Sequence, residues 1–302
     1  MEPLNVTREN FPMSTASAAG MIPMTPKTDN YEIFYKEDVP YRTCGDRTLY
    51  LQIIGPTGIQ EAVPCIVYIP GSAFKEQNVK ERVPQLAYLA QMGYVVAALE
   101  YRGSETASFP AQALDAKAGV SYMKEHAGEY GIHPDKMFLM GDSSGGHTAV
   151  TAAFSYGVAG MEEADNASGE PIVKGVIDLY GTTNFLTMNE EPSSQDHRAP
   201  DSPEGCEIGG KAVLEHPELA APAVLANYVQ KERKLPPILM FHGTNDELVP
   251  FGQSCELCNA LTEAGKDVTF YQVFGAHHGG PEFWTKEVLS IEDSFIRRVC
   301  GE

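Results

Sequence analysis

Short apolar runs alternate along the chain with segments whose apolar residues recur at helical spacing. The runs that we expect to form strands are Tyr31–Tyr35, Arg47–Ile54, Cys65–Ile69, Val95–Leu99, Met137–Met140, Val173–Leu179, Ile238–Phe241 and Thr269–Val273. The segments that we expect to form helices are Val83–Met92, Pro110–Tyr130, Gly145–Ser155, Gly252–Ala264 and Glu282–Val299. The first two strands are typical of a hairpin or meander, and the later ones of parallel strands covered on both faces. The alternation predicts βαβ units and an α/β fold with a mostly parallel, eight-stranded sheet that has helices on both faces.

Three stretches depart from this alternation. Residues 1–30 are rich in Pro, Met, Ser, Thr and Ala without any period, and we interpret them as an N-terminal arm before a single domain at 31–302. The polar segment 159–171 and the Pro-, Ser- and Gly-rich segment 189–210 indicate excursions above the sheet. Each excursion is either a plain surface loop or a wall of a substrate pocket, since loops at the carboxyl ends of strands carry the sites in such sheets.

The charge of the chain narrows the classes of partner. It has 41 acidic and 22 basic residues, a formal net charge of −19. Such a surface repels nucleic acid and anionic membranes, so a neutral small molecule or a carbohydrate is the easier match. No apolar run approaches the length of about 18 residues that a membrane span needs. The first residues lack the basic and apolar regions of a signal peptide, which predicts a cytoplasmic location.

The six cysteines show no spacing that indicates a disulfide framework. Cys255 and Cys258 form a C-x-x-C pair, which we interpret either as two reduced thiols on one helix face or as a redox or metal pair. No second pair at zinc-site spacing completes it. The sequence therefore predicts no cofactor and no bound metal.

The sharpest chemical signal is the serine in the run Gly141-Asp142-Ser143-Ser144-Gly145-Gly146. An apolar strand precedes this G-x-S-x-G motif and a helix of small residues follows it, which is the context of a nucleophile elbow. The flanking glycines remove side chains that would clash in so sharp a turn, and the helix N-terminus favours developing negative charge. The motif predicts Ser143 as a nucleophile, and a Gly-Ser turn at a helix cap is the alternative. Ser144 does not fit the centre of the motif, because Asp142 would then stand at a glycine position.

A serine nucleophile needs an acid and a base, which follow it in this fold in the order Ser, Asp or Glu, His. Asp246 lies in a polar turn just past the strand at Ile238–Phe241 and is predicted as the acid, with Glu247 as the fallback. The alternative for Asp246 is a residue that merely forms the turn. The histidines that come after Asp246 are His277 and His278. The two glycines after His278 leave the backbone free to turn its ring into a site, which favours His278 as the base.

The tetrahedral intermediate of acyl transfer needs backbone N–H donors aimed at its oxyanion. One donor is expected from Ser144, the residue after the nucleophile, and another from the loop after the third strand. That loop reads Pro70-Gly71-Ser72-Ala73-Phe74, and its small residues leave backbone amides free to face a site. It predicts the amides of Ser72 and Ala73 as donors, with a plain turn as the alternative.

These features together resemble the α/β-hydrolase esterases near the hormone-sensitive-lipase group, and most of all its BD-FAE-like branch of acetyl and feruloyl carbohydrate esterases. The resemblance runs from roughly residue 45 to the end and is carried by Glu100–Ser104, Phe109–Ala111 with Asp115, Glu129–Asp135, the elbow, His242-Gly243 with Asp246 and Val249-Pro250, Gly275–Gly279, Ser202–Glu204 and Gly209-Gly210. It implies the α/β-hydrolase fold and places the base at His278. One departure is that Pro70, Ser72 and Ala73 replace a histidine and two glycines of the family's His-Gly-Gly-Gly. Backbone donors are kept, but side chains enter a loop that usually has the freedom of glycine, and we expect them to narrow the site.

Three functions follow from this interpretation. The first is a serine carboxylesterase that hydrolyses short-chain, acetyl-like esters through an acyl-enzyme, with acetylated or feruloylated carbohydrates as candidate substrates. The second is an amidohydrolase or peptidase, such as a formamidase, that uses the same three residues. The third is a degenerate hydrolase that serves as a binding module, which the presence of all three residue types in the required order disfavours.

Overall fold

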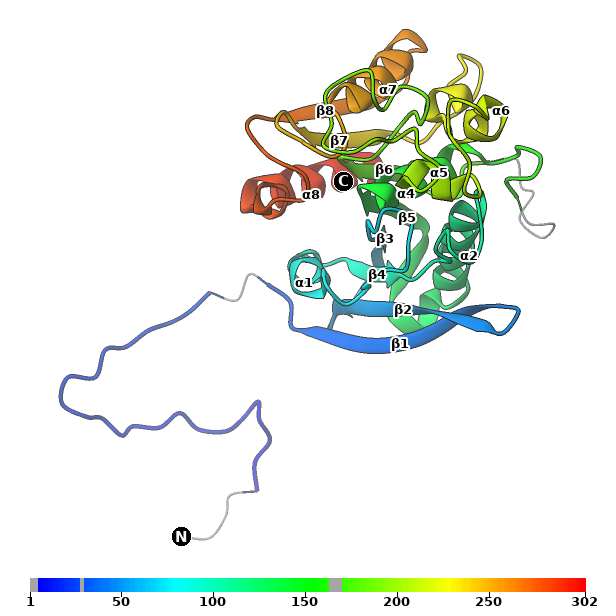
Figure 1. Ribbon diagram of the computed structural model, residues 1–302. Helices are drawn as coiled ribbons and strands as arrows, with labels where there is room; N and C mark the ends of the chain where they lie inside the picture. The colour runs from blue at the N-terminus through cyan, green and yellow to red at the C-terminus, as the bar shows by residue number, and fades with distance from the viewer. Residues whose placement is uncertain (1–4, 28–29, 163–169) are drawn as a thin grey trace.

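The computed structural model describes residues 5–27, 30–162 and 170–302. Within these residues one sheet has eight strands in the order β1-β2-β4-β3-β5-β6-β7-β8 (Figure 1). The strands are β1 (Ile33–Cys44), β2 (Arg47–Pro56), β3 (Val63–Ile69), β4 (Val95–Leu99), β5 (Ile132–Asp142), β6 (Gly175–Leu179), β7 (Ile238–Gly243) and β8 (Val268–Val273). β2 pairs antiparallel with β1 and β4, and the other neighbours are parallel. The predicted mostly parallel, eight-stranded sheet is confirmed.

Helices cover both faces of the sheet. They are α1 (Val83–Gln91), α2 (Ala111–Glu125), α3 (Ala127–Tyr130), α4 (Ser144–Phe154), α7 (Gly252–Glu263) and α8 (Lys286–Cys300). α1 and α8 pack on one face, where Leu89 and Phe295 belong to one apolar cluster with Ile66 of β3. α2, α4 and α7 pack on the other face, in a cluster that includes Val67 of the same strand. Successive side chains of a strand point to opposite faces, so the continuous apolar runs in the sequence supply both clusters.

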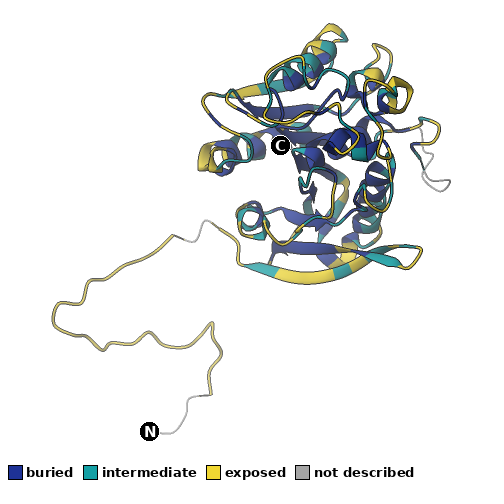
Figure 2. Cartoon of the chain, viewed as in Figure 1, coloured by how far each residue is buried: buried dark blue, intermediate teal, exposed yellow. Residues whose placement is uncertain are grey.

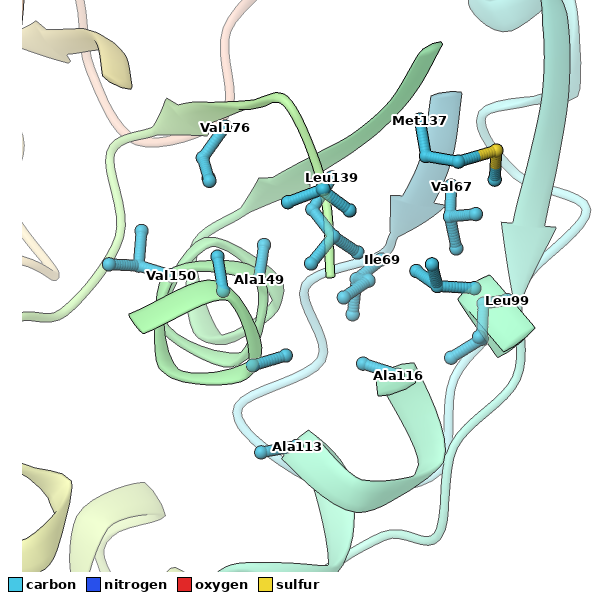
Figure 3. Packing of buried hydrophobic residues seen from close by; sticks show 14 of the residues in the cluster. Val67, Ile69, Leu99, Ala113, Ala116, Met137, Leu139, Ala149, Val150 and Val176 are labelled. Carbon is cyan, nitrogen blue, oxygen red and sulfur yellow. The ribbon is translucent and has the colours of Figure 1, made fainter. Parts of the chain in front are cut away.

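Small helical residues let α2 and α4 approach the sheet closely. Figure 3 shows Leu139 and Val176 of the sheet near Ala149 of α4, while Leu99 lies near Ala116 of α2. Each fully buried Leu or Val side chain in this layer contributes about 1.5–3 kcal/mol to folding. The packed layer makes the carboxyl ends of the central strands a rigid platform for the residues that follow them.

Residues 189–228, part of the segment between β6 and β7, contain short helices, and we call this part the insert. They are α5 (Pro203–Glu207), α6 (Pro217–Ala220) and the 3₁₀ turns η1 (Ala221–Ala223) and η2 (Leu225–Tyr228). The sequence predicted only a loop excursion at 189–210, whereas α5 lies within it. This helix is too short to show helical periodicity, and it is set by its N-terminal cap, where Ser202 accepts the Gly205 amide at 2.9 Å.

Other differences concern the ends of elements. β1 reaches Cys44, although its expected end was Tyr35. It is an edge strand whose outer face is polar and largely exposed (Figure 2), so the added residues form no apolar run that would predict a strand. The last helix begins at Lys286 rather than Glu282, after the 3₁₀ turn η3 (Pro281–Trp284) and an N-cap at Thr285. Residues 5–27 of the predicted arm are exposed and contain no helix or strand (Figures 1 and 2). Most of the predicted excursion at 159–171 lies outside the described residues.

Candidate active site

Ser143 stands at the sharp turn between β5 and α4, as the elbow motif predicts. Its backbone has φ 54° and ψ −126°, a conformation that is unfavourable for a residue with a side chain. A Cβ on Gly141 would lie 2.2 Å from the carbonyl oxygen of Gly145, and a Cβ on Gly145 would lie 2.0 Å from that of Ile69. Only glycine fits these two positions, so the motif is a packing requirement of the turn.

Three predicted side chains form one chain of hydrogen bonds. Nε2 of His278 lies 2.9 Å from Oγ of Ser143, and Nδ1 of His278 lies 2.7 Å from Oδ2 of Asp246. Ser143 follows β5, Asp246 follows β7, and His278 follows β8, so the parallel strands bring all three to the same end of the sheet. Because the carboxylate only accepts, Nδ1 carries a proton and Nε2 is left to accept from the serine hydroxyl.

Asp246 is held as a carboxylate by several donors. Its Oδ1 accepts the amides of Leu248 and Val249, both at 2.9 Å. Its Oδ2 lies 3.3 Å from Nε2 of His242 in addition to His278. Burial raises the pKa of Asp246, but its contacts with His242 and His278 together outweigh burial and hold that pKa well below its usual range. His242, which the sequence offered only as part of a His-Gly motif, therefore helps to keep the acid ionised.

The other two candidates for acid and base lie outside this chain of hydrogen bonds. His277 is exposed, and its Nδ1 lies 3.0 Å from Oε2 of Glu247. Glu247 was the fallback for the acid, yet its side chain is half-exposed and pairs with His277. The structure thus brings His278 and Asp246 to Ser143 and places His277 and Glu247 at the rim.

The loop after β3 has an unusual backbone. Ala73 and Phe74 both have positive φ, 55° and 60°, which normally costs a residue with a side chain about 1–2 kcal/mol. The amide of Ser72, predicted as an oxyanion donor, donates to Oγ of Ser144 at 2.9 Å. Within the part of the chain that the structure describes, the amides of Ala73 and Ser144 have no hydrogen-bond acceptor. Two of the three predicted donors are therefore unoccupied.

A buried carboxylate joins the elbow to this loop. Asp142 accepts from the Tyr68 hydroxyl at 2.6 Å, from the Gly71 amide at 2.8 Å and from the Tyr180 hydroxyl at 3.2 Å. The ring of Tyr180 in turn stands edge-on to that of His278, with 4.9 Å between their centroids. This role of Asp142 was not predicted, although an acidic residue at the end of a buried strand is a signal that could have indicated it.

Aromatic rings from three elements form a wall behind the loop. Phe74 stands edge-on to His147 of α4 and to Phe185, with centroids 5.4 and 5.5 Å away, and His147 stacks on Phe185 at 4.9 Å. Burial lowers the pKa of His147 to about 4, so its ring is neutral and behaves as one of the aromatic rings. We call Phe74, His147 and Phe185 the aromatic wall.

The insert is tied directly to the turn that carries Asp246. Ser194 donates its amide to the carbonyl of Glu247 at 2.8 Å, and Nε2 of His197 donates to the carbonyl of Leu248 at 2.9 Å. Nδ1 of His197 lies 2.8 Å from the buried carboxylate of Glu204 in α5. The 189–210 segment is thus anchored to the turn that carries Asp246, and both interpretations of it stay open.

The described residues contain no group of three or more His, Cys, Asp or Glu side chains that could hold a metal ion. Cys255 and Cys258 are free thiols on α7, and burial raises the pKa of Cys255, which disfavours its thiolate. Among the described residues no helix has both the length and the apolar character needed to cross a membrane.

Comparisons with known proteins show which family and which fold the chain resembles. The model of the BD-FAE family matches residues 51–261. Two curated relatives from Mycobacterium tuberculosis are "Esterase LipQ", 29% identical over 71% of this chain, and "Probable carboxylic ester hydrolase LipM", 28% identical over 69% of it. The matches cover 50% and 47% of those proteins, so the chain spans about half the length of the curated relatives it matches.

A solved structure resembles nearly the whole chain. It is a truncated carbohydrate esterase from gut microbiota, with a TM-score of 0.78 and 28% identity, and the likeness covers 92% of this chain and 99% of the other. Together with the strand order, this likeness confirms the α/β-hydrolase fold predicted from the sequence.

Proposed function

This chain belongs to the BD-FAE family, and because Ser143, His278 and Asp246 form one continuous chain of hydrogen bonds, we propose that it is a serine carboxylesterase. That hydrogen-bond chain carries the proposal, since it gives the hydroxyl a base and gives the base an orienting carboxylate. The relatives with esterase names support an ester as the bond that is cleaved.

In the first half of the reaction, Oγ of Ser143 attacks the carbonyl carbon of the ester while Nε2 of His278 takes the hydroxyl proton. The carboxylate of Asp246 stabilises the imidazolium and keeps Nδ1 as the protonated nitrogen. The oxyanion of the tetrahedral intermediate accepts from the unoccupied amides of Ala73 and Ser144. Ser72, the third predicted donor, would have to share an N–H that Ser144 Oγ already accepts.

Collapse of the intermediate breaks the ester C–O bond, and His278 returns its proton to the leaving alcohol. The acyl group then remains on Oγ of Ser143. In the second half, a water molecule gives a proton to His278 and attacks the acyl carbon. His278 then returns that proton to Oγ of Ser143 as the acyl C–O bond breaks, which releases the carboxylic acid and restores the serine. No step needs a metal ion or an organic cofactor.

The substrate that we propose is a short-chain, acetyl-like ester, with acetylated or feruloylated carbohydrates as candidates. Side chains at Ser72 and Ala73 occupy a loop where the family usually has glycine, and the aromatic wall stands directly behind it. We therefore expect the site to accept only a short acyl chain. A net charge of −19 disfavours anionic substrates, and the likeness to a carbohydrate esterase supports a sugar as the alcohol.

The amidohydrolase alternative uses the same chemistry, but no specific observation favours an amide over an ester. A binding module would not need the base and the acid to be aligned on Ser143. The small-molecule or carbohydrate ester therefore remains the proposed partner of the site.

The test is a panel of acetyl to decanoyl esters with aryl and sugar alcohols, assayed beside formamide and aminoacyl substrates. We expect hydrolysis of the short esters, and covalent labelling of Ser143 alone by a serine-directed phosphonate. Ser143→Ala should lower kcat by about 10⁴- to 10⁶-fold and abolish the label. Faster turnover of the amides, labelling at Ser144, or full activity of Ser143→Ala would refute the proposal.

A further inference from the structure

The two residues that flank Ser143 each bind an amide of the oxyanion loop, which we define as residues 70–74. Asp142, on the N-terminal side, accepts the Gly71 amide through Oδ1 at 2.8 Å. Ser144, on the C-terminal side, accepts the Ser72 amide through Oγ at 2.9 Å. The elbow thus holds two successive amides of the loop with side chains, in addition to turning the chain at Ser143.

The Ser144 side chain is buried, so it makes this contact and does not reach the surface. The residue is 2% exposed, at the first position of α4. The phenol of Tyr101, itself fully buried, lies 2.9 Å from Ser72 Oγ and 3.1 Å from the Pro70 carbonyl oxygen. Burial raises the pKa of Tyr101, so its phenol keeps its proton and can donate to the Pro70 carbonyl oxygen. The buried side chains of Ser144 and Tyr101 therefore both contact the loop, at the Ser72 amide and at Ser72 Oγ.

The loop needs such support because its backbone is strained. Ala73 and Phe74 have positive φ, where glycine would be comfortable and residues with side chains are not. Strained conformations persist only where the surroundings over-determine them. The loop also lies tightly against the elbow, since a Cβ on Gly71 would lie 2.6 Å from the carbonyl oxygen of Asp142.

We propose that the Ser144 hydroxyl is a positioning group, which fixes the Ser72 amide so that the strained turn presents the Ala73 amide to the oxyanion. The backbone amide of Ser144 remains a donor to the same oxyanion, so this residue serves the site twice. The Ser72 amide donates a hydrogen bond that holds the loop in place, and it does not serve as an oxyanion donor. This inference rests on the proposed esterase function.

The hydroxyl matters mainly in the transition state, because the amide that it positions meets full negative charge only there. Ser144→Ala keeps the backbone amide and removes the acceptor of the Ser72 N–H. We expect kcat on a short ester to fall by about 10- to 100-fold, while KM changes by less than about twofold. This decrease in kcat is no larger than the one that removal of a direct oxyanion donor usually causes. Ser144→Thr, which keeps a hydroxyl on the same carbon, should recover most of the lost kcat.

The matched control is Ser155→Ala, the same substitution of a fully buried serine at the other end of α4. It should leave kcat unchanged. Complete labelling with a phosphonate counts the folded sites of each variant, so kcat is expressed per labelled site. Should Ser144→Ala not fold, Ser144→Cys takes its place with the same expectation, since its sulfur is only a weak acceptor.

The outcomes separate this inference from the proposed function. If wild type hydrolyses the ester and Ser144→Ala has the kcat of Ser155→Ala, the positioning role is wrong and the esterase proposal stands. A rise in KM with constant kcat would also overturn the positioning role, because it would indicate a ground-state contact. If wild type hydrolyses no ester, the proposed function fails first, and this inference fails with it.

Discussion

The ring of His277 lies against the carboxylate of Glu247, with 3.0 Å between Nδ1 and Oε2, on the exposed side of the loop that also carries His278. The two neighbouring histidines thus have separate carboxylate partners in neighbouring residues, since His278 binds Asp246 at 2.7 Å. Exposed pairs of this kind contribute little to stability, and the His277 pair lies at the rim, outside the hydrogen-bond chain of Ser143.

This division predicts opposite results for two alanine variants. His278→Ala should lower kcat/KM about as severely as Ser143→Ala, on the order of 10⁴-fold or more, because it removes the proton carrier. His277→Ala should cost about tenfold or less, since it removes only a rim contact. Both are measured on one acetyl ester, and an inactive His277→Ala beside an active His278→Ala would show that the base is misassigned.

Asp246→Asn should lower kcat by about 10⁴-fold, because the amide no longer stabilises the imidazolium and favours the wrong tautomer of His278. The variant should stay folded, as the amides of Leu248 and Val249 keep an oxygen acceptor. Glu247→Gln is the control, since Glu247 was the alternative acid and lies at the rim. A severe loss in Glu247→Gln with an active Asp246→Asn would reverse the assignment.

Acyl-chain length tests the aromatic wall. Acetyl to butyryl esters should be turned over faster than esters of about ten carbons, and a chelator should leave the rate unchanged. Phe185→Ala, which opens the wall while leaving Phe74 and the loop in place, should shift the preference towards longer chains. If this variant has the same preference for acyl-chain length as wild type, the wall does not border the acyl group. Inhibition by the chelator would indicate that the reaction needs a metal ion.

Asp178 supplies a prediction about stability and pH. It is fully buried, and within the described residues only its Oδ1 has a donor, the Gly181 amide at 3.1 Å. Burial raises the pKa of Asp178 to about 7, the nearby charge of Asp142 adds to this, and the Gly181 amide opposes it. Because the pKa in the unfolded chain is about 3.9, the protonated form stabilises the fold at low pH, and this contribution is lost as the pH rises to about 7.

Asp178→Asn removes this titration. The variant should therefore gain stability relative to wild type between pH 4 and pH 8, as measured by urea unfolding at both values. Asp201→Asn, which changes an exposed carboxylate, should show no such trend. A difference between Asp178→Asn and wild type that is the same at both pH values would contradict the raised pKa.

Sequence patterns predicted the parts of the molecule that local chemistry determines. The parallel strands are continuous apolar runs, and the elbow requires glycine at Gly141 and Gly145 for steric reasons that a motif records. The order of the three candidate catalytic residues along the chain follows from the fold, so the sequence alone predicts Ser143, Asp246 and His278.

The remaining features depend on contacts between distant segments. The bond from the Ser72 amide to Ser144 Oγ joins residues 72 positions apart, and nothing near either residue indicates it. The positive φ of Phe74 was unexpected for the same reason, because its ring is held by α4 and by Phe185 rather than by its neighbours in sequence. Short helices such as α5 are likewise set by a cap and by tertiary packing, with too few residues to show a period.

The position of β8 at the edge of the sheet determines how the protein should lose activity in denaturant. β5, which leads to Ser143, is hydrogen-bonded to a strand on each side. Within the described residues β8 pairs with β7 alone, and its side chains are partly exposed. Edge strands open locally at a lower free energy than central ones. His278 follows this edge strand. We therefore expect a low concentration of denaturant to abolish hydrolysis while the circular dichroism spectrum is still that of the folded protein. Dilution of the denaturant should then restore the rate of hydrolysis without any refolding of the core.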